Sequence, residues 1–308
     1  MGKMVRTVRG DIPAAELGVC YPHEHLLCGP PEPLEDRDLI LDSEDAAVRE
    51  LGWFREAGGN ALVEMSPPDY RRDPAALRRI SEAAGVHVVC TTGYHKDAFS
   101  ARYVEDKTVD ELTERFVREV TEGIGETGVR AGVIKAGTMK DQLGANAEKV
   151  LRAAARAHQV TGAPVSTHTD AGTMGREQVR ILLEEGADPE KVLIGHLDRQ
   201  LEWEYLRDIA ETGVTLGFDQ ISKEKYYPDR ERIVFILRLV EAGYGDQITL
   251  SGDLARKSYW PSYGTGGGPG LTYILWRFVP WLREEGLDEE HIDRILVKTP
   301  ARLFGLES

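Results

Sequence analysis

The chain of 308 residues carries 52 acidic and 38 basic side chains, a formal net charge of -14 at pH 7. This excess of acidic groups argues against a nucleic-acid-binding surface, because phosphate binding needs clustered lysine and arginine. No stretch predicts a signal peptide or a membrane span, and the three cysteines lack Cys-x-x-Cys spacing. We therefore expect a cytoplasmic protein with reduced, buried thiols.

The composition is even along the chain. No linker rich in proline or serine and no block of charge divides the sequence. Because α/β barrels of this length are commonly one domain, we expect residues 1–308 to form a single domain.

The predicted elements alternate between strand and helix. Ser43 is a suitable N-cap for the first helix, and Gly58 with Gly59 ends it. Near-continuous apolar runs, typical of a parallel sheet covered on its outer face, predict the strands. Strands are expected near residues 17–25, 60–65, 86–91, 131–135, 163–168, 192–196, 214–218 and 248–253, and helices over residues 43–57, 73–84, 109–125, 145–161, 176–185, 201–211, 229–242 and 271–285. This order predicts a (β/α)8 TIM barrel, whose active site lies at the C-terminal ends of the strands.

The end of the first predicted strand carries the sequence Pro22-His23-Glu24-His25. Side chains alternate along a strand, so His23 and His25 point to the same face and can bind one metal ion together. Glu24 points the other way, toward structure. Alone, this spacing equally fits two structural histidines.

Four later strands each end in one further candidate metal ligand. These residues are Lys135, His168, His196 and Asp253. With the two histidines of the first strand, six candidate ligands then lie at the C-terminal ends of five strands. This is the end at which a barrel builds its active site.

At these positions the chain resembles the phosphotriesterase family of the amidohydrolase superfamily, including its lactonase-like members and the phosphotriesterase-related proteins. The resemblance covers essentially the whole chain and implies a binuclear metal centre and a homodimer. The matching motifs, in family order, are His23-Glu24-His25, Val133-Ile134-Lys135, Thr167-His168, Gly195-His196-Leu197-Asp198 and Leu250-Ser251-Gly252-Asp253.

The resemblance also divides the ligands between two metals. It implies that His23, His25 and Asp253 hold the more buried ion, and that His168 and His196 hold the more exposed one. Imidazole and carboxylate ligands suit zinc, while manganese, iron and cobalt accept the same set. Six protein ligands are too many for one tetrahedral zinc but fit two ions that share a bridge.

Lys135 is the unusual member of the set. At the end of a barrel strand its ammonium would lie in a dry interior, which favours the neutral amine. A neutral amine reacts with carbon dioxide to form a carbamate, and the resemblance implies that Lys135 is an N6-carboxylysine that bridges both metals. The alternative is a partly exposed lysine in a salt bridge.

The expected chemistry is hydrolysis. A hydroxide bridging the two metals would be the nucleophile, because coordination lowers the pKa of water to about 7. Asp253 would take up the proton and Asp198 would relay it, unless Asp198 is a buried residue that binds a backbone amide or Arg199. Lactonase-like relatives tend to carry a tyrosine that touches the bridging solvent, and here either Tyr94 or His95 could fill that place.

Cationic and aromatic side chains follow the seventh and eighth strands. We hypothesise that Lys223, Tyr226 and Arg256 bind a carboxylate or phosphate group of the substrate. The alternative is that these are ordinary surface residues. The long irregular stretch over residues 256–270 is expected to form a lid or a wall of the substrate pocket.

The motifs do not separate a lactone from a phosphotriester, a carboxylic ester or an amide, because the same nucleophile can attack each centre. The resemblance to lactonase-like members favours a lactone or similar ester, with promiscuous phosphotriesterase activity. A phosphotriesterase or an N-acyl amide hydrolase is the alternative. A more remote alternative is a non-catalytic binding protein on the same barrel. Such a protein would be expected to have lost some of the metal ligands, whereas all six positions are intact.

Overall fold

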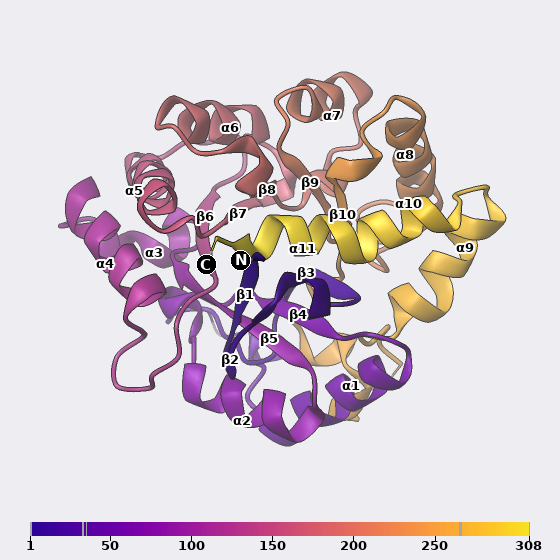
Figure 1. The fold of residues 1–308 in the computed structure, drawn as a ribbon, viewed down its shortest axis with the longest axis horizontal. Coiled ribbons are helices and arrows are strands. Elements are labelled where there is room, and N and C mark those ends of the chain that lie inside the picture. Colours follow the sequence, from indigo (N-terminus) through magenta and orange to yellow (C-terminus); the bar gives the residue numbers. More distant parts are fainter. Residues whose placement is uncertain (1, 33, 35, 265–266, 308) are drawn as a thin grey trace.

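The computed structural model describes residues 2–32, 34, 36–264 and 267–307. The eight predicted strands are confirmed: they form one parallel sheet in which sequence neighbours are sheet neighbours, surrounded by helices as a (β/α)8 barrel (Figure 1). The strands are β3 (Cys20–Glu24), β4 (Ala61–Glu64), β5 (His87–Gly93), β6 (Val133–Thr138), β7 (Val165–Thr169), β8 (Val192–Ile194), β9 (Thr215–Phe218) and β10 (Ile248–Leu250).

The two edges of the sheet meet between β10 and β3. The amide of Asp253 donates to the carbonyl of His23 at 3.3 Å, and the amide of His23 donates to Oγ of Ser251 at 2.9 Å. The junction therefore brings two candidate ligands, from opposite ends of the chain, into contact.

The barrel helices follow the strands in sequence. Ser43 caps the first of them, because its side chain accepts from the amide of Ala46 at 3.2 Å. The helices are α1 (Glu44–Glu56), α2 (Pro74–Ala84), α3 (Asp97–Val104), α4 (Val109–Thr121), α5 (Ala145–Thr161), α6 (Gly175–Glu184), α7 (Trp203–Ala210), α8 (Asp229–Glu241), α9 (Val279–Glu284), α10 (Glu289–Asp293) and α11 (Thr299–Phe304). Within the described residues, no helix is long and apolar enough to cross a membrane.

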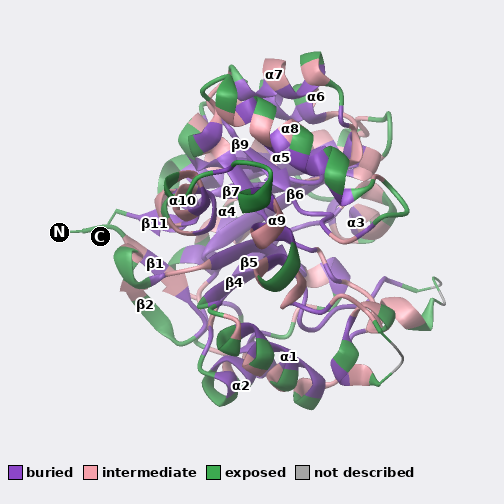
Figure 2. Ribbon diagram, turned by 90° about the vertical axis from the view of Figure 1, so that its right-hand side faces the viewer, coloured by how far each residue is buried: buried purple, intermediate pink, exposed green. Residues whose placement is uncertain are grey.

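A second, antiparallel sheet closes the N-terminal end of the barrel. In it β1 (Met4–Thr7) lies between β2 (Gly10–Pro13) and β11 (Gly305–Leu306). Val5 packs among residues at the starts of the barrel strands, and both ends of the chain emerge together at this face (Figures 1 and 2). The opposite end of the barrel is left open for a site.

The stretch predicted as a lid or pocket wall is anchored to the barrel. Trp260 is buried and donates from Nε1 to the carbonyl of Leu254 at 2.7 Å. The hydroxyl of Tyr263 accepts from the amides of Asp42 and Ser43, just before α1. Residues 265 and 266 of the predicted stretch lie outside the described residues.

Candidate metal centre

Three of the predicted ligands converge on one point. Nε2 of His25 lies 3.1 Å from Oδ1 of Asp253, and Nε2 of His23 lies 4.0 Å from the same oxygen. One ligand atom from each lies within 4.8 Å of the others, a spacing that could hold a metal ion. Nζ of Lys135, on β6, lies 2.9 Å from Nε2 of His23. These four groups therefore share one face of the barrel mouth.

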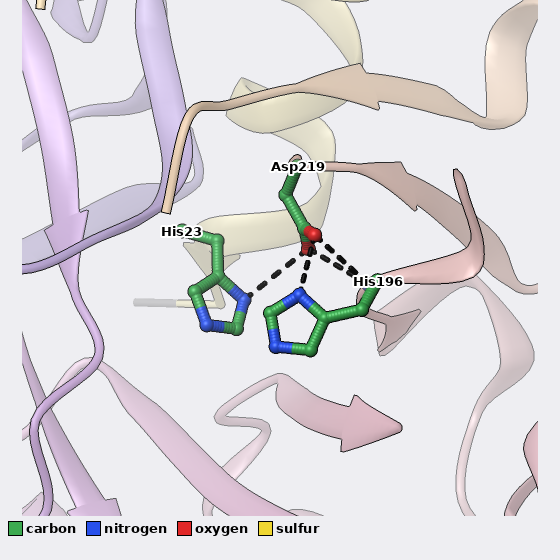
Figure 3. Close-up of side chains that lie close together, drawn as sticks. All are labelled: His23, His196 and Asp219. Carbon is green, nitrogen blue, oxygen red and sulfur yellow. Dashed lines mark hydrogen bonds and ion pairs between the residues drawn. The ribbon is translucent and has the colours of Figure 1, made fainter. Parts of the chain in front are cut away.

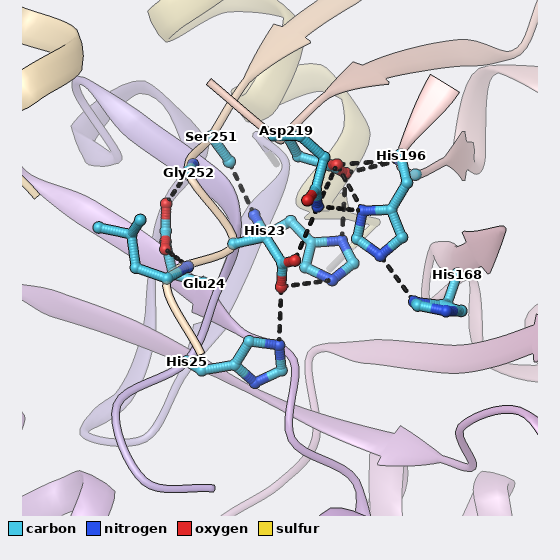
Figure 4. A network of polar contacts seen from close by, with 12 residues as sticks. His23, Glu24, His25, His168, His196, Asp219, Ser251 and Gly252 are labelled. Carbon is cyan, nitrogen blue, oxygen red and sulfur yellow. Dashed lines mark hydrogen bonds and ion pairs between the residues drawn. The ribbon is translucent and has the colours of Figure 1, made fainter. Parts of the chain in front are cut away.

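The other two predicted ligands lie beside this group. Nε2 of His196 lies 2.7 Å from Nδ1 of His168, and the rings of His196 and His23 are 4.7 Å apart between centroids (Figure 4). All six predicted ligands thus belong to one cluster at the C-terminal ends of five strands.

The rings are held with their lone pairs directed at this cluster. The Asp219 carboxylate lies 2.5 Å from Nδ1 of His196 and 3.4 Å from Nδ1 of His23 (Figure 3). An ionised carboxylate only accepts, so this contact favours the ring proton of His196 on Nδ1 and leaves the lone pair of Nε2 directed at Nδ1 of His168. Orientation of a metal-binding histidine by a carboxylate behind it is a recurring feature of metal sites.

His25 is fixed in the same way. Ser66 donates its hydroxyl to Glu64 at 2.6 Å, so its oxygen accepts from Nδ1 of His25 at 2.8 Å. Nε2 of His25 is then unprotonated and faces Asp253. Within the described residues, the two close nitrogen pairs of the cluster, His196 with His168 and Lys135 with His23, can each form an N–H···N hydrogen bond. The same nitrogen atoms are ligand types that divalent metal ions accept.

Lys135 is fully buried. Burial lowers the pKa of its ammonium to about 8, although the nearby Asp253 and Asp219 carboxylates oppose the shift. A neutral amine is therefore accessible near physiological pH, which is the form that reacts with carbon dioxide. Gly93 allows β5 and β6 to approach each other closely, because a Cβ at this position would lie 2.0 Å from the carbonyl oxygen of Lys135.

Asp253 lies in a left-handed turn, with φ 46°. The carboxylate of Glu24 holds that turn by accepting from the amides of Gly252 at 2.6 Å and Leu254 at 3.0 Å. Burial opposes ionisation of Asp253, but the Lys223 ammonium, 2.9 Å from Oδ2, holds its pKa well below the usual range. Asp253 is therefore a candidate ligand that is charged before any metal binds.

Asp198 is buried behind the cluster. Its carboxylate accepts from the amides of Asp219 at 3.3 Å and Gln220 at 3.0 Å, and from Nε of Arg232 at 2.7 Å. These contacts join Asp198 to the backbone around Asp219; in the described part of the chain none joins it to Asp253.

Tyr94 and His95 point in different directions. The hydroxyl of Tyr94 is bound by Arg115, and its ring packs 5.9 Å from that of Phe116, away from the cavity. His95 lines the cavity, with its ring 4.3 Å from that of His168. The amide of Lys96 donates to Nδ1 of His95 at 2.8 Å, which leaves the proton on Nε2.

The cluster of predicted ligands opens into a cavity of about 340 Å³, which is lined by both charged and aromatic side chains. Of the predicted substrate contacts, Tyr226 lies under the Arg199 guanidinium at 4.0 Å, and Arg256 pairs through Nη1 with Asp36 at 2.8 Å. Lys223 is mostly buried and also donates to the carbonyl of Asp253. The cavity is lined by His25, Leu39, Tyr70, His95, Lys96, Phe99, His168, Asp170, His196, Arg199, Gln220, Lys223, Tyr226, Asp253, Ala255, Arg256 and Tyr259.

Three further residues near the cluster were not predicted from the sequence: Asp219, Lys96 and Asp170. Asp219 directly follows β9, just as the candidate ligands follow the other strands, so its position was a signal. Asp170 directly follows β7 in the same way, at the start of a short 3-10 helix, and Lys96 lies between β5 and α3, but nothing in the sequence pairs these two residues.

The barrel and its cluster of imidazole, carboxylate and amine groups define a metal-binding hydrolase of the (β/α)8 class. The chain belongs to the phosphotriesterase family, whose model matches residues 3–304. Members of this family are hydrolases that act on esters or lactones and use a binuclear metal centre.

Individual relatives cover nearly the whole chain. A phospho-furanose lactonase of Mycoplasmopsis synoviae is 36% identical, over 99% of this chain and 92% of the relative. The phosphotriesterase homology protein of Escherichia coli is 33% identical, over 93% of this chain and 98% of the relative. The crystal structure of a lactonase from Listeria monocytogenes has a TM-score of 0.94 at 37% identity, over 99% of this chain and all of that one.

Proposed function

We propose that the protein is a metal-dependent lactonase whose substrate is a sugar lactone that carries a phosphate group. The observation that carries this proposal is the cluster of six predicted ligands, four of which line a cavity that also has cationic side chains on its wall. The similarity to a phospho-furanose lactonase along 99% of the chain supports the same substrate class. We also propose that the whole chain acts as one domain.

The ligand set fits two divalent ions, for which we propose zinc. When bound, they would activate water and polarise the carbonyl group of the lactone. Lys135 would bridge them as a carbamate formed with carbon dioxide. The remaining ligands would be His23, His25 and Asp253 on the more buried ion, and His168 and His196 on the more exposed one.

Asp253 would accept the proton released during attack. Its Oδ1 faces the ligand cluster, while Oδ2 accepts from Lys223 at 2.9 Å and from Gln220 at 2.7 Å. These two contacts hold the carboxylate in a fixed orientation. The contacts of Asp198 support a positioning role, because it fixes the backbone amides next to Asp219.

His95 would donate a hydrogen bond from Nε2 to the reacting group. Burial, together with the Lys135 and Lys96 charges, holds the pKa of His95 well below its usual value. The ring is therefore a neutral donor of fixed orientation. Its contact with the ring of His168, one of the proposed metal ligands, supports this role.

Arg256 is the proposed contact for the phosphate group. Its partners Asp36 and Asp38 are partly exposed and both pair with Nη1, while Arg256 also lines the cavity, which supports this role because a guanidinium has further N–H donors for an anion. Lys223 is engaged with Asp253 and is better suited to hold that ligand than to bind the phosphate.

A substrate panel tests the function. Metal-replete protein prepared with bicarbonate is given phosphorylated and unphosphorylated sugar lactones, a phosphotriester and N-acyl amides, with metal-free protein as the blank. We expect the highest kcat/KM for a phosphorylated lactone and a much lower one for the phosphotriester. Faster turnover of an amide or of the phosphotriester would overturn the proposed substrate class.

Arg256→Met tests the phosphate contact. Loss of one charge-assisted hydrogen bond, worth about 1.5–3 kcal/mol, should raise KM for the phosphorylated lactone by about 10-fold or more. The same variant should keep KM for the unphosphorylated lactone within about 2-fold of wild type. An equal rise for both lactones would show that Arg256 acts on the fold of the loop and not on the phosphate.

A further inference from the structure

A second cluster of charged side chains lines the cavity, apart from those already assigned a role. Lys96 follows β5, Asp170 follows β7 and Arg199 follows β8, and all three line the cavity. Nζ of Lys96 lies 2.9 Å from Oδ2 of Asp170, and Nη1 of Arg199 lies 3.8 Å from Oδ1. The Asp170 carboxylate thus sits between two cations, and the roles proposed above use none of these groups.

Each member of this cluster is fixed from outside it. The carbonyl of Asp170 accepts from the amide and the hydroxyl of Thr173, at 3.2 and 3.0 Å. The Arg199 guanidinium stacks over the Tyr226 ring, and the amide of Lys96 is bound to His95. The cluster is therefore formed before substrate binds, which lowers the cost of ordering it.

The cluster also keeps groups free for a ligand. The three side chains are 19%, 23% and 21% exposed, in the order Lys96, Asp170, Arg199, so each keeps a face toward the cavity. An ammonium has three donors, a guanidinium has five, and a carboxylate accepts at about four positions. The contacts among the three side chains use only some of these donors and acceptors. The donors of Lys96 and Arg199 lie on either side of the Asp170 carboxylate.

We propose that Lys96, Asp170 and Arg199 form a subsite for hydroxyl groups on the carbons next to the lactone carbonyl. A hydroxyl both donates and accepts, so two neighbouring hydroxyls match an acceptor flanked by donors. An alkyl group there would remove water from three charges without replacing its hydrogen bonds. Lys96 adjoins His95, which contacts the His168 ring, so the subsite lies near the carbonyl end of the substrate. This inference rests on the proposed lactonase function and assigns its substrate as a polyhydroxylated lactone.

The test compares a phosphorylated 2,3-dihydroxy lactone with its 2,3-dideoxy analogue. The measured quantity is the ratio of their kcat/KM values, for wild type and for Asp170→Asn, which keeps the shape of the side chain and removes its charge. We expect wild type to prefer the hydroxylated lactone by about 10-fold or more, and Asp170→Asn to lose about 10-fold of that preference. Asp110→Asn, which alters an exposed aspartate paired with Arg156, is the matched control and should keep the wild-type ratio.

The outcomes separate the two proposals. If wild type hydrolyses neither lactone, the proposed function fails. If it hydrolyses both without preference, or if Asp170→Asn slows both equally, the subsite is overturned while the lactonase stands. If Asp170→Asn is too unstable to assay, Lys96→Met decides: a reduced preference supports the subsite, and an unchanged preference overturns it.

Discussion

Replacing Asp253 with asparagine is expected to lower kcat/KM for the lactone by about 100- to 10,000-fold. The carboxylate of Asp253, whose Oδ1 lies 3.1 Å from Nε2 of His25, would both bind metal and accept a proton. The amide of asparagine is neutral and a poor base. The variant should therefore lose proton transfer and part of its metal affinity together.

Replacement by asparagine removes the charge of the Asp253 side chain and keeps the backbone conformation. Asp253 has φ 46°, and asparagine is among the few residues other than glycine that adopt this conformation readily. The contacts of Glu24 to the amides on either side of Asp253 do not involve the replaced group. The barrel should consequently keep its fold, and the measurements are kcat/KM, metal content per chain and Tm.

The control for this variant is Asp208→Asn. Asp208 is an exposed residue of α7 that pairs with Arg176 at 2.6 Å, and its replacement should leave kcat/KM within about 2-fold of wild type. Retention of two metals and more than a tenth of the activity by Asp253→Asn would show that this carboxylate is not the proton acceptor.

The cluster of candidate metal ligands could be predicted from sequence because all eight strands of the barrel run in the same direction. The last residues of every strand therefore lie at the same end of the sheet, and candidate ligands there lie close together. This includes His23 and Asp253, which meet where β3 and β10 close the barrel. Ser43 was a reliable helix start because its capping bond is local. These features depend on neighbours in sequence or on the strand order alone.

The parts that were missed depend on contacts between loops or between the chain ends. β1 pairs with β11 across nearly the whole length of the chain, and neither strand has a periodic pattern that would identify it. The short helix α3 was missed because its preceding residue, Lys96, supplies no side-chain cap. The pairing of Lys96 with Asp170 joins two loops, and only the closed barrel brings them together.

Replacing Arg232 with methionine is expected to lower the free energy of unfolding by about 3–5 kcal/mol. The Arg232 side chain on α8 is 0% exposed and donates to Asp198 at 2.7 Å and to Asp229 at 2.9 Å, both also 0% exposed. Methionine fills much of the same space, but it leaves two buried carboxylates without their cation. Because Asp198 binds the amides of Asp219 and Gln220, the loss should also loosen the loop behind His196 and weaken metal binding.

Arg79→Met is the matched control, because it breaks an ion pair of similar length at the surface. Nη2 of Arg79 lies 2.6 Å from Oε1 of Glu44, but these side chains are 57% and 41% exposed. Water replaces the lost partner there, so the cost should be at most about 1 kcal/mol, with no change in metal content. Denaturant unfolding of both variants measures the difference. If the two substitutions cost the same, burial is not what makes the Arg232 network stabilising, and the link from α8 to the metal centre through Asp198 would be wrong.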